Sequence, residues 1–256
     1  PFDISTRVSA GDSERCKLTG TADNSGNFIF DLTFSSDGMK FFVVSGRDGN
    51  FNGDDKVTGF DLTSPFDVST CVFATQFSVL DFAPVTQNSE AGNYAGARRH
   101  HRAQGIEINN DGTKLFLLFH DGGTTDDVGA RLYEFTLTTP YDVSTIYDFG
   151  TSTSNIVTTA GILLPDTVLG ANNPSGMRFT PDGKRILIIG HSSTNVLQIS
   201  LTNAFDTSSF TIDGGINLNT GISPSNAHPQ GVTFSTSGLK LYIGNDNDTG
   251  TDQVME

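Results

Sequence analysis

The chain has 256 residues and a formal net charge of −14, with 15 Lys and Arg residues against 29 Asp and Glu residues. An electrostatic field of that sign repels phosphate backbones, so the charge argues against nucleic acid as a partner. Hydrophobic residues make up 36% of the chain, which is enough for a packed core. No apolar run reaches the roughly 18 residues that a membrane span needs.

Four strands are predicted in the first part of the chain. A short strand with alternating polar and apolar residues ends at a Ser-Asp-Gly turn, and the apolar run FFVV follows at residues 41–44. A third strand is expected over residues 57–62 and a fourth over residues 71–77. The Asp-Gly pair supplies the positive φ that a tight hairpin needs. Matching turns recur along the chain as FSSDG at 34–38, INNDG at 108–112, FTPDG at 179–183 and FSTSG at 234–238.

The four-stranded unit repeats at intervals of tens of residues, with no helical periodicity between the copies. This pattern predicts an all-β fold, a β-propeller with four recognisable four-stranded blades. A β-sandwich is the alternative architecture, but it predicts no strict long period.

A second motif stands between the third and fourth strands of each unit. We expect its aromatic residue to pack onto its own blade and its Asp to accept local backbone hydrogen bonds. A structural role is favoured, because a turn is needed in every blade and a catalytic group only once. The copies read PFDIST at 1–6, PFDVST at 65–70, PYDVST at 140–145 and AFDTSS at 204–209.

These turns, of the form F-S-x-D-G-x-K-L-Y and L-S-x-P-F-D-V-S-T, resemble the repeats of tandem β-propeller proteins of bacteria and marine phages. The resemblance covers nearly the whole chain and implies one propeller domain over residues 1–256, either free-standing or as one part of a longer repeat protein. Because propellers host many activities, it implies little about function. The expected blades are residues 28–103, 104–173, 174–228, and 229–256 together with 1–27, so that the N-terminal strand completes the last blade.

Clustered Asp and Asn residues mark the loops between the second and third strands. Asp48, Asn50, Asn52 and Asp54 alternate like the oxygen ligands of a calcium loop, although the terminal Glu of an EF-hand is missing. The alternative is that Asp, Asn and Gly simply favour loops. Calcium is thus the one cofactor predicted, and its further candidate ligands are Asp121, Asp126, Asp127, Asp246, Asp248 and Asp252.

A basic cluster lies in the long connection over residues 80–103. It could pair with the acidic loops, bind an anionic glycan or carboxylate, hold a catalytic acid or base, or neutralise its neighbours on the surface. Repeat alignment predicts that Arg102, Asn173 and His228 converge near the channel mouth. It also places Glu107 and Arg178 at one register position, where the other two units have Thr33 and Thr233, and predicts an ion pair between them beside the channel. The cluster consists of Arg98, Arg99, His100, His101 and Arg102.

The two cysteines, Cys16 and Cys71, form no CxxC pair, which argues against a thiolate zinc site. A disulfide is possible in an oxidising compartment. Two separate buried thiols are the interpretation that sequence reasoning favours.

No GxSxG or HExxH motif occurs in the chain. The sequence therefore favours a non-enzymatic binding, structural or adhesion module of a virion, a cell surface or an extracellular assembly. Its expected partners are other protein subunits or surface glycans, and self-association is a further option. The alternative is a secreted calcium-dependent hydrolase or polysaccharide lyase with its site at the channel mouth.

Overall fold

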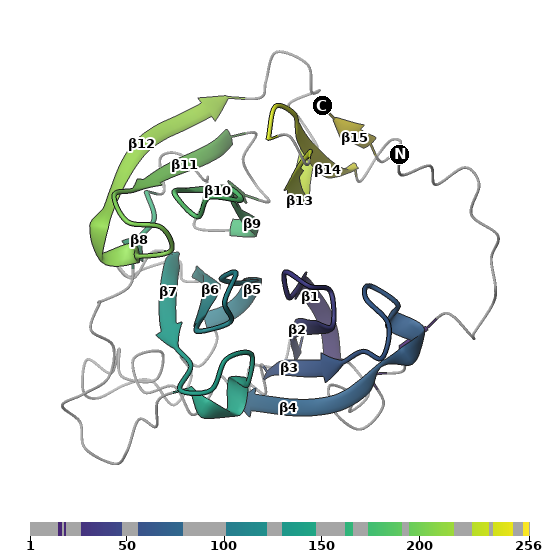
Figure 1. The fold of residues 1–256 in the computed structure, drawn as a ribbon. Helices are drawn as coiled ribbons and strands as arrows, with labels where there is room; N and C mark the ends of the chain where they lie inside the picture. The colour runs from purple at the N-terminus through teal and green to yellow at the C-terminus, as the bar shows by residue number, and fades with distance from the viewer. Residues whose placement is uncertain are drawn as a thin grey trace, which may run out of the picture.

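The computed structural model describes residues 15–16, 18, 27–47, 56–78, 101–121, 130–146, 162–165, 174–190, 195–217, 227–235, 238–247 and 253–255. These residues form four antiparallel β-sheets that stand around a common centre (Figure 1). The predicted all-β propeller is confirmed, with one sheet for each of the four expected blades. Within the described ranges, the structure contains no helix with the length and apolar character of a membrane span.

The strands of each blade follow chain order from the centre of the ring outward (Figure 1). The first blade contains β1 (Asn27–Phe34), β2 (Lys40–Arg47), β3 (Lys56–Asp61) and β4 (Val72–Ser78). The second contains β5 (His101–Ile108), β6 (Lys114–Asp121), β7 (Arg131–Thr136) and β8 (Ile162–Leu163). The third contains β9 (Pro174–Phe179), β10 (Arg185–Gly190), β11 (Asn195–Leu201) and β12 (Phe210–Asn217). The described part of the fourth contains β13 (Ala227–Phe234), β14 (Leu241–Asn247) and β15 (Gln253–Met255).

The outer strand of the second blade is described in two places. In the first and third blades, β4 and β12 begin immediately after the aromatic-Asp turn. In the second blade, an isolated bridge joins Leu137 to Ile146 after the turn, at the place where Leu201 pairs with Phe210 in the third blade, and β8 follows at residues 162–163. Residues 147–161 lie outside the described residues.

Apolar clusters between neighbouring blades form the core. Phe42 and Val44 of β2 pack with Ile106, Leu115 and Leu117 of the second blade. The intervening β2 residues belong to a separate cluster on the other face of the sheet, as the alternation of a strand requires. Similar clusters join the second blade to the third and the third to the fourth. Burial of this apolar surface holds the sheets face to face.

Strand pairing fixes which residues are equivalent in the four blades. Alignment of the repeats predicts that Thr33, Glu107, Arg178 and Thr233 share one inner-strand position. The structure pairs these four residues with Phe42, Phe116, Leu187 and Tyr242, which also occupy one position of the second strands. The predicted register is confirmed, and each blade can be compared residue by residue with its neighbours.

The aromatic residue of the second motif adopts a left-handed backbone, with φ of 59° at Phe66, 61° at Tyr141 and 55° at Phe205. This conformation is unfavourable for a bulky residue. In the first blade, the Phe66 N–H donates to the carbonyl oxygen of Gly38 at 2.8 Å, and its ring packs on that glycine. The expected packing of the aromatic residue on its own blade is confirmed in these three copies.

The Asp of the same motif caps a short 3-10 turn: η3 (Val68–Thr70), η6 (Val143–Thr145) or η7 (Thr207–Ser209). The predicted local hydrogen bonds are confirmed. The Oδ1 atom accepts the backbone N–H two residues later at 3.0 Å in all three described copies, from Ser69 to Asp67, from Ser144 to Asp142 and from Ser208 to Asp206.

Cys16 and Cys71 form a disulfide, with Cα atoms 5.7 Å apart. The expectation of two separate thiols is therefore wrong. The bridge attaches the chain near residue 16 to the start of β4, where Leu18 and Cys16 also pack against buried Phe41 and Phe60. Sequence could not place these two Cα atoms, because the cysteines are 55 residues apart and neither belongs to the repeated motifs that define the register.

The predicted completion of the last blade by the N-terminal strand lies outside the described residues. The first inner strand, β1, begins at Asn27, one residue before the expected blade limit at 28. Elsewhere, the inner strands β5 and β13 begin at His101 and Ala227, slightly ahead of the expected limits at 104 and 229, and β9 begins at Pro174.

Candidate functional site

An ion pair between neighbouring inner strands lies at the centre of the ring. The Arg178 Nη1 atom of β9 donates to the Glu107 Oε1 atom of β5 at 2.6 Å, which confirms the pair predicted from the register. The Thr33 hydroxyl of β1 donates to the other Glu107 oxygen at 3.0 Å. The Glu107 side chain is only 9% exposed. Its contacts with Thr33 and Arg178 join the inner strands of three blades.

Asp31 joins this group, and sequence reasoning missed it. Its Oδ2 atom accepts the backbone N–H of Ile106 at 3.1 Å, and its Oδ1 atom accepts that of Leu32 at 2.8 Å. A signal was present in the sequence, because the other three blades have glycine at the same register position. Those glycines are Gly105, Gly176 and Gly231.

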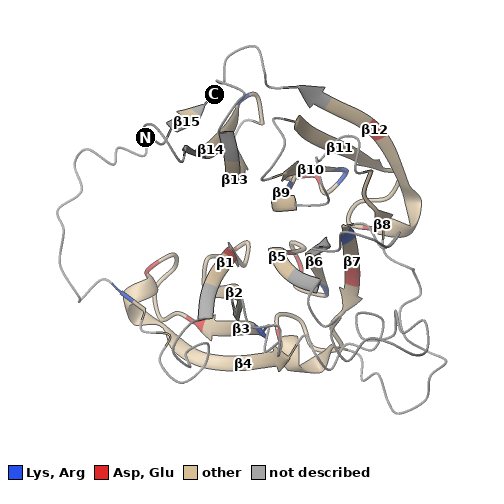
Figure 2. Ribbon diagram, turned by 180° about the vertical axis from the view of Figure 1, so that it is seen from behind, with Lys and Arg blue, Asp and Glu red and all other residues tan. Residues whose placement is uncertain are grey.

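The polar contacts continue from the third blade to the fourth. The Arg178 Nε atom donates to the carbonyl oxygen of Val232 on β13 at 3.3 Å, and the Ser175 hydroxyl of β9 donates to that of Pro229. A chain of polar contacts therefore links β1, β5, β9 and β13 around the centre. Figure 2 shows these four strands closest to the centre of the ring, with acidic segments on β1 and β5.

Burial shifts the titration of both carboxyl groups in this cluster. Burial raises the pKa of Glu107 to about 7, an effect that Arg178 opposes and the charge of Asp31 reinforces. Burial also raises the pKa of Asp31, again against the attraction of Arg178. Two carboxyl groups share one guanidinium, so the cluster favours keeping one proton near neutral pH. The cluster can stabilise the contact between the inner strands, and it can bind and release a proton.

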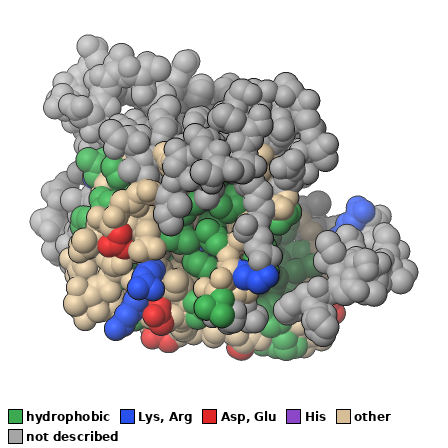
Figure 3. All heavy atoms as spheres, turned by 90° about the horizontal axis from the view of Figure 1, so that it is seen from above, with side chains coloured by type: hydrophobic (Ala, Val, Ile, Leu, Met, Phe, Trp, Pro, Cys, Tyr) green, Lys and Arg blue, Asp and Glu red, His purple; other side chains and the backbone are tan. Residues whose placement is uncertain are grey.

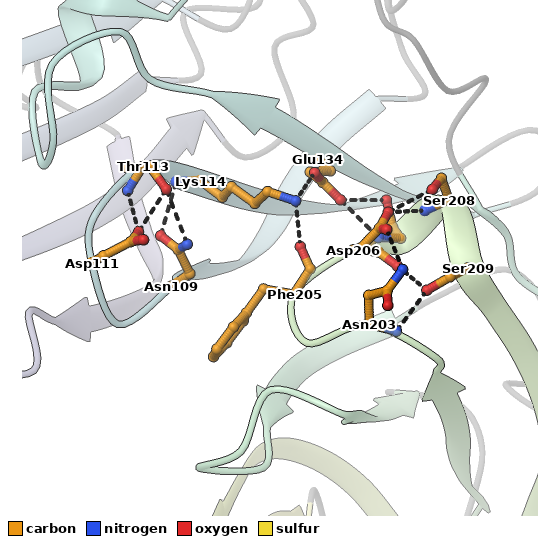
Figure 4. Close-up of polar contacts among 11 residues, drawn as sticks. Asn109, Asp111, Thr113, Lys114, Glu134, Asn203, Phe205, Asp206, Ser208 and Ser209 are labelled. Carbon is orange, nitrogen blue, oxygen red and sulfur yellow. Dashed lines mark hydrogen bonds and ion pairs between the residues drawn. The ribbon is translucent and has the colours of Figure 1, made fainter.

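A second polar network joins the blades on the turn side of the ring. The Lys114 Nζ atom lies 2.6 Å from Glu134 Oε1 and donates to the Phe205 carbonyl oxygen at 2.7 Å (Figure 4). Glu134 Oε2 accepts both the N–H and the hydroxyl of Thr207, each at 2.8 Å. The second blade thereby holds the aromatic-Asp turn of the third blade.

A related contact joins the first blade to the second. The Thr75 hydroxyl of β4 donates to Asp142 Oδ1 at 2.7 Å and accepts the N–H of Ser144 at 3.1 Å. In both cases, side chains of one blade bind the 3-10 turn of the next. The contacts use different residues, so the repeat motif alone did not predict them.

The basic cluster predicted to bind a ligand is only partly covered by the structure. Arg98, Arg99, His100 and Asn173 lie outside the described residues. The backbone places His101 and Arg102 at the start of β5, opposite Asp121 and His120 at the end of β6.

His228 stands in the fourth blade at the position that Arg102 occupies in the second, and its partner is Asp246 at the end of β14. Strand pairing thus brings candidate cationic and acidic residues to the same end of two blades. That end is the one from which the loops between second and third strands extend.

The calcium prediction rests almost entirely on residues outside the described ranges. Asp121 and Asp246 are placed by their backbones at the ends of β6 and β14. Among the described residues, no group of three potential metal ligands occurs. The remaining candidates are outside the described residues: Asp48, Asn50, Asn52, Asp54, Asp126, Asp127, Asp248 and Asp252.

Surface charge on the described part of one flank is mixed. Figure 3 shows basic and acidic side chains interspersed with hydrophobic ones there. On this part of the flank, acidic side chains are thus accompanied by basic ones, despite the net charge of −14 of the chain.

No protein-family model matches the chain, and no curated protein matches it. Among solved structures, the chain is similar to the periplasmic gluconolactonase PpgL of Pseudomonas aeruginosa, with 12% identity, a TM-score of 0.49, and coverage of 88% of this chain and 67% of that one. It is also similar to the β-propeller domain of Myceliophteria thermophila Cps50 (Swd1), with 12% identity, a TM-score of 0.44, and coverage of 89% and 73%. A third similar structure is a functionally unknown protein from Desulfotomaculum acetoxidans, with 12% identity and a TM-score of 0.43. The alignment covers 89% of this chain but only 55% of that protein's length.

Proposed function

We propose that the chain is a non-enzymatic β-propeller module that binds an anionic partner at the mouth of its ring, on a virion, a cell surface or another extracellular assembly. The observation that carries the proposal is the register of the inner strands. It sets His101 opposite Asp121, and His228 opposite Asp246, at the loop-bearing end of the ring. Loops and strand ends on one face of a rigid scaffold are where binding residues are concentrated.

Acidic surface glycans are the first class of partner. Guanidinium and imidazolium groups bind carboxylates and sulfates through charge-assisted hydrogen bonds. Calcium held by Asp and Asn oxygens would coordinate the same anionic groups. An acidic patch on another protein subunit offers equivalent chemistry and is the second class of partner.

The disulfide supports an extracellular location. Cys16 and Cys71 are bonded to each other, and disulfides form and persist mainly outside the cytosol. We also propose, from the repeat motifs, that the chain belongs with the tandem β-propeller proteins and forms part of a longer array.

Binding to a panel of uronic-acid and sulfated polysaccharides, with calcium or with EDTA, tests the proposal. Arg102→Gln and His228→Gln should each weaken binding about tenfold, equivalent to ~1.4 kcal/mol. The matched control is Arg185→Gln, which removes a charge at the opposite, turn-side end of β10 and should bind like the parent chain. Equal binding by all three variants would reject the mouth as the site, and no binding to the panel would reject glycans as the ligand.

A secreted calcium-dependent hydrolase or polysaccharide lyase is a second candidate, and Glu107 is the observation that favours it. A buried carboxyl with a pKa of about 7 is suited to general acid–base catalysis. Incubation with the same polysaccharides, analysed for newly formed chain ends, separates the two functions. Cleavage that disappears in Glu107→Gln while binding persists would establish the enzyme, whereas polysaccharides that are bound and left intact support the binding module.

A further inference from the structure

Each of the three interfaces between neighbouring blades buries two inner-strand positions of the later blade. Strand pairing shows that each position is the same in all of these blades. The first position packs in the apolar cluster that the two blades share, and its residues are at most 5% exposed: Ile106, Met177 and Val232. The second position holds a smaller residue, which is also buried: Ala103, Pro174 or Pro229.

The first blade has large apolar residues at both positions, and both are exposed. Leu32 stands at the position of Ile106 and is 45% exposed. Ile29 stands at the position of Ala103 and is 50% exposed. The chain near Cys16 packs against the second and third strands of this face. The inner edge of the face is therefore the part that stays open.

The aromatic-Asp turn of the first blade is uncovered on the same side. In the second blade, the ring centroid of Tyr141 lies 6.5 Å from that of Phe42 in the preceding blade. In the third blade, the ring centroid of Phe205 lies 6.4 Å from that of Phe116 in the preceding blade. Phe66, their counterpart in the first blade, is 61% exposed. The first blade thus exposes apolar side chains where the second and third blades meet a preceding blade.

The fourth blade has a matching surface on its opposite face. In the first three blades, one second-strand residue packs in the cluster shared with the following blade and is fully buried: Val44, Leu118 or Ile189. The fourth blade has Gly244 at this position. A Cβ atom added to Gly176 of the third blade would come within 3.3 Å of the Gln230 carbonyl oxygen of the next blade. Its counterpart Gly231 is exposed, and no described atom lies within 4 Å of an added Cβ there.

We propose that the chain associates head to tail with a second copy of itself, so that the face with Gly231 and Gly244 in one copy packs on Ile29 and Leu32 of the other. Side-chain volumes compensate at this contact. The first blade has Ile where the later blades have Ala or Pro, and the fourth has Gly where the earlier blades have Val, Leu or Ile. The contact also continues the series of three established blade interfaces in the same register.

The occupant is a second copy because Leu32 and Gly231 both stay exposed within one chain. Burial of the exposed apolar side chains drives the association. A head-to-tail contact uses two different surfaces, so it closes into a ring or continues into a row of chains. The inference concerns assembly and does not depend on the anionic partner proposed above.

Two further contacts should form at this junction. Across the interface between the second and third blades, the Lys114 Nζ atom donates to the Phe205 carbonyl oxygen at 2.7 Å. Lys240 is exposed and occupies the same position in the fourth blade, so it should donate to the Phe66 carbonyl oxygen of the second copy. Tyr242 occupies the register position of the two covering rings described above and should pack on the Phe66 ring.

Light scattering after size-exclusion chromatography of the 256-residue chain measures the association. We expect a mass of at least two chains, which falls on dilution. Leu32→Glu places a charge in the contact and should raise the dissociation constant about tenfold or more. The matched control is Leu163→Glu, because Leu163 is similarly exposed, at 47%, but lies on the outer strand of the second blade. A parent chain that is monomeric at every concentration, or equal masses for the two variants, would overturn the proposal.

Cysteine cross-linking identifies the occupant even if Leu32→Glu fails to fold. Chains with Leu32→Cys, mixed with chains with Gly244→Cys, should form a disulfide that joins one chain of each kind. Chains with Leu163→Cys in place of Leu32→Cys should not form it. In a chain with both Leu32→Cys and Gly244→Cys, the link should again join two chains. A link formed at the mass of one chain would overturn the proposal, because the chain's own fourth blade would then cover the first.

Discussion

Glu107→Gln should remove a large part of the pH dependence of stability. In the folded chain, burial raises the pKa of Glu107 to about 7, against an ordinary value of 4.5. Between these two values the folded state holds a proton that the unfolded state has released. The free energy of unfolding therefore falls as the pH rises through this window and levels off above about pH 7.

The shift sets the magnitude. A difference of 2.5 pH units between 4.5 and 7 corresponds to about 3 kcal/mol at 1.36 kcal/mol per unit. Most of it, about 2.5 kcal/mol, should be lost between pH 5 and pH 8. In the variant, the carboxamide oxygen can still accept from Arg178, and the amide can donate to Thr33, so the contacts survive without a titrating group.

Urea unfolding followed by circular dichroism at several pH values between 5 and 8 measures the effect. The quantity to compare is the difference between the parent chain and Glu107→Gln, because Asp31, whose pKa burial also raises, contributes to both. Asp213→Asn is the control. Hydrogen bonds from Gln198 and Ser200 lower the pKa of Asp213, so its titration lies outside this range. A parent–variant difference that stays constant from pH 5 to 8 would refute the assignment of the shift to Glu107.

Three further results are expected. Asp142→Ala should cost more stability than Asp67→Ala, by about 1 kcal/mol, because Asp142 also accepts the Thr75 hydroxyl of the neighbouring blade; equal losses in chemical denaturation would count against that contact. Reduction of the disulfide between Cys16 and Cys71 should lower stability by up to about 4 kcal/mol, as the loop-closure relation gives for a separation of 55 residues, and an unchanged melting temperature in reductant would contradict this. Millimolar calcium should raise the melting temperature relative to chelator if the loop oxygens bind the ion, whereas coincident melting curves would argue against a calcium site.

Repetition decided how far the sequence could be interpreted. Features needed in every blade were predictable, because each copy supports the others: the strand order, the Asp-Gly turns and the capping role of Asp67 and Asp142. The ion pair of Glu107 with Arg178 could be predicted for the opposite reason. Glu107 and Arg178 replace the Thr that the other two blades have at the same register position, where the blades can be compared directly.

What the sequence left undetermined depends on distances between blades. Asp31 replaces a glycine of the repeat, but its role comes from the Ile106 N–H that another blade presents to it. The disulfide depends on where the chain near residue 16 lies relative to the start of β4, which the repeat pattern does not fix. Both deciding contacts are tertiary, and neither has a counterpart in the other copies within the part of the chain that the structure describes.

These unrepeated contacts have a consequence for the order of the blades. Sheets built from one repeat present similar apolar faces, so hydrophobic packing alone discriminates weakly between correct and incorrect neighbours. Glu107 contacts Arg178 between the second and third blades, and it contacts Thr33 between the first and second blades. The two interfaces therefore differ chemically. Buried ion pairs add little net stability, but leaving one partner uncompensated is costly. We infer that the inner-strand cluster destabilises misordered blades more than it stabilises the correct order. The contacts of Lys114 and Glu134 with the third-blade turn favour the correct neighbour in the same way on the turn side of the ring.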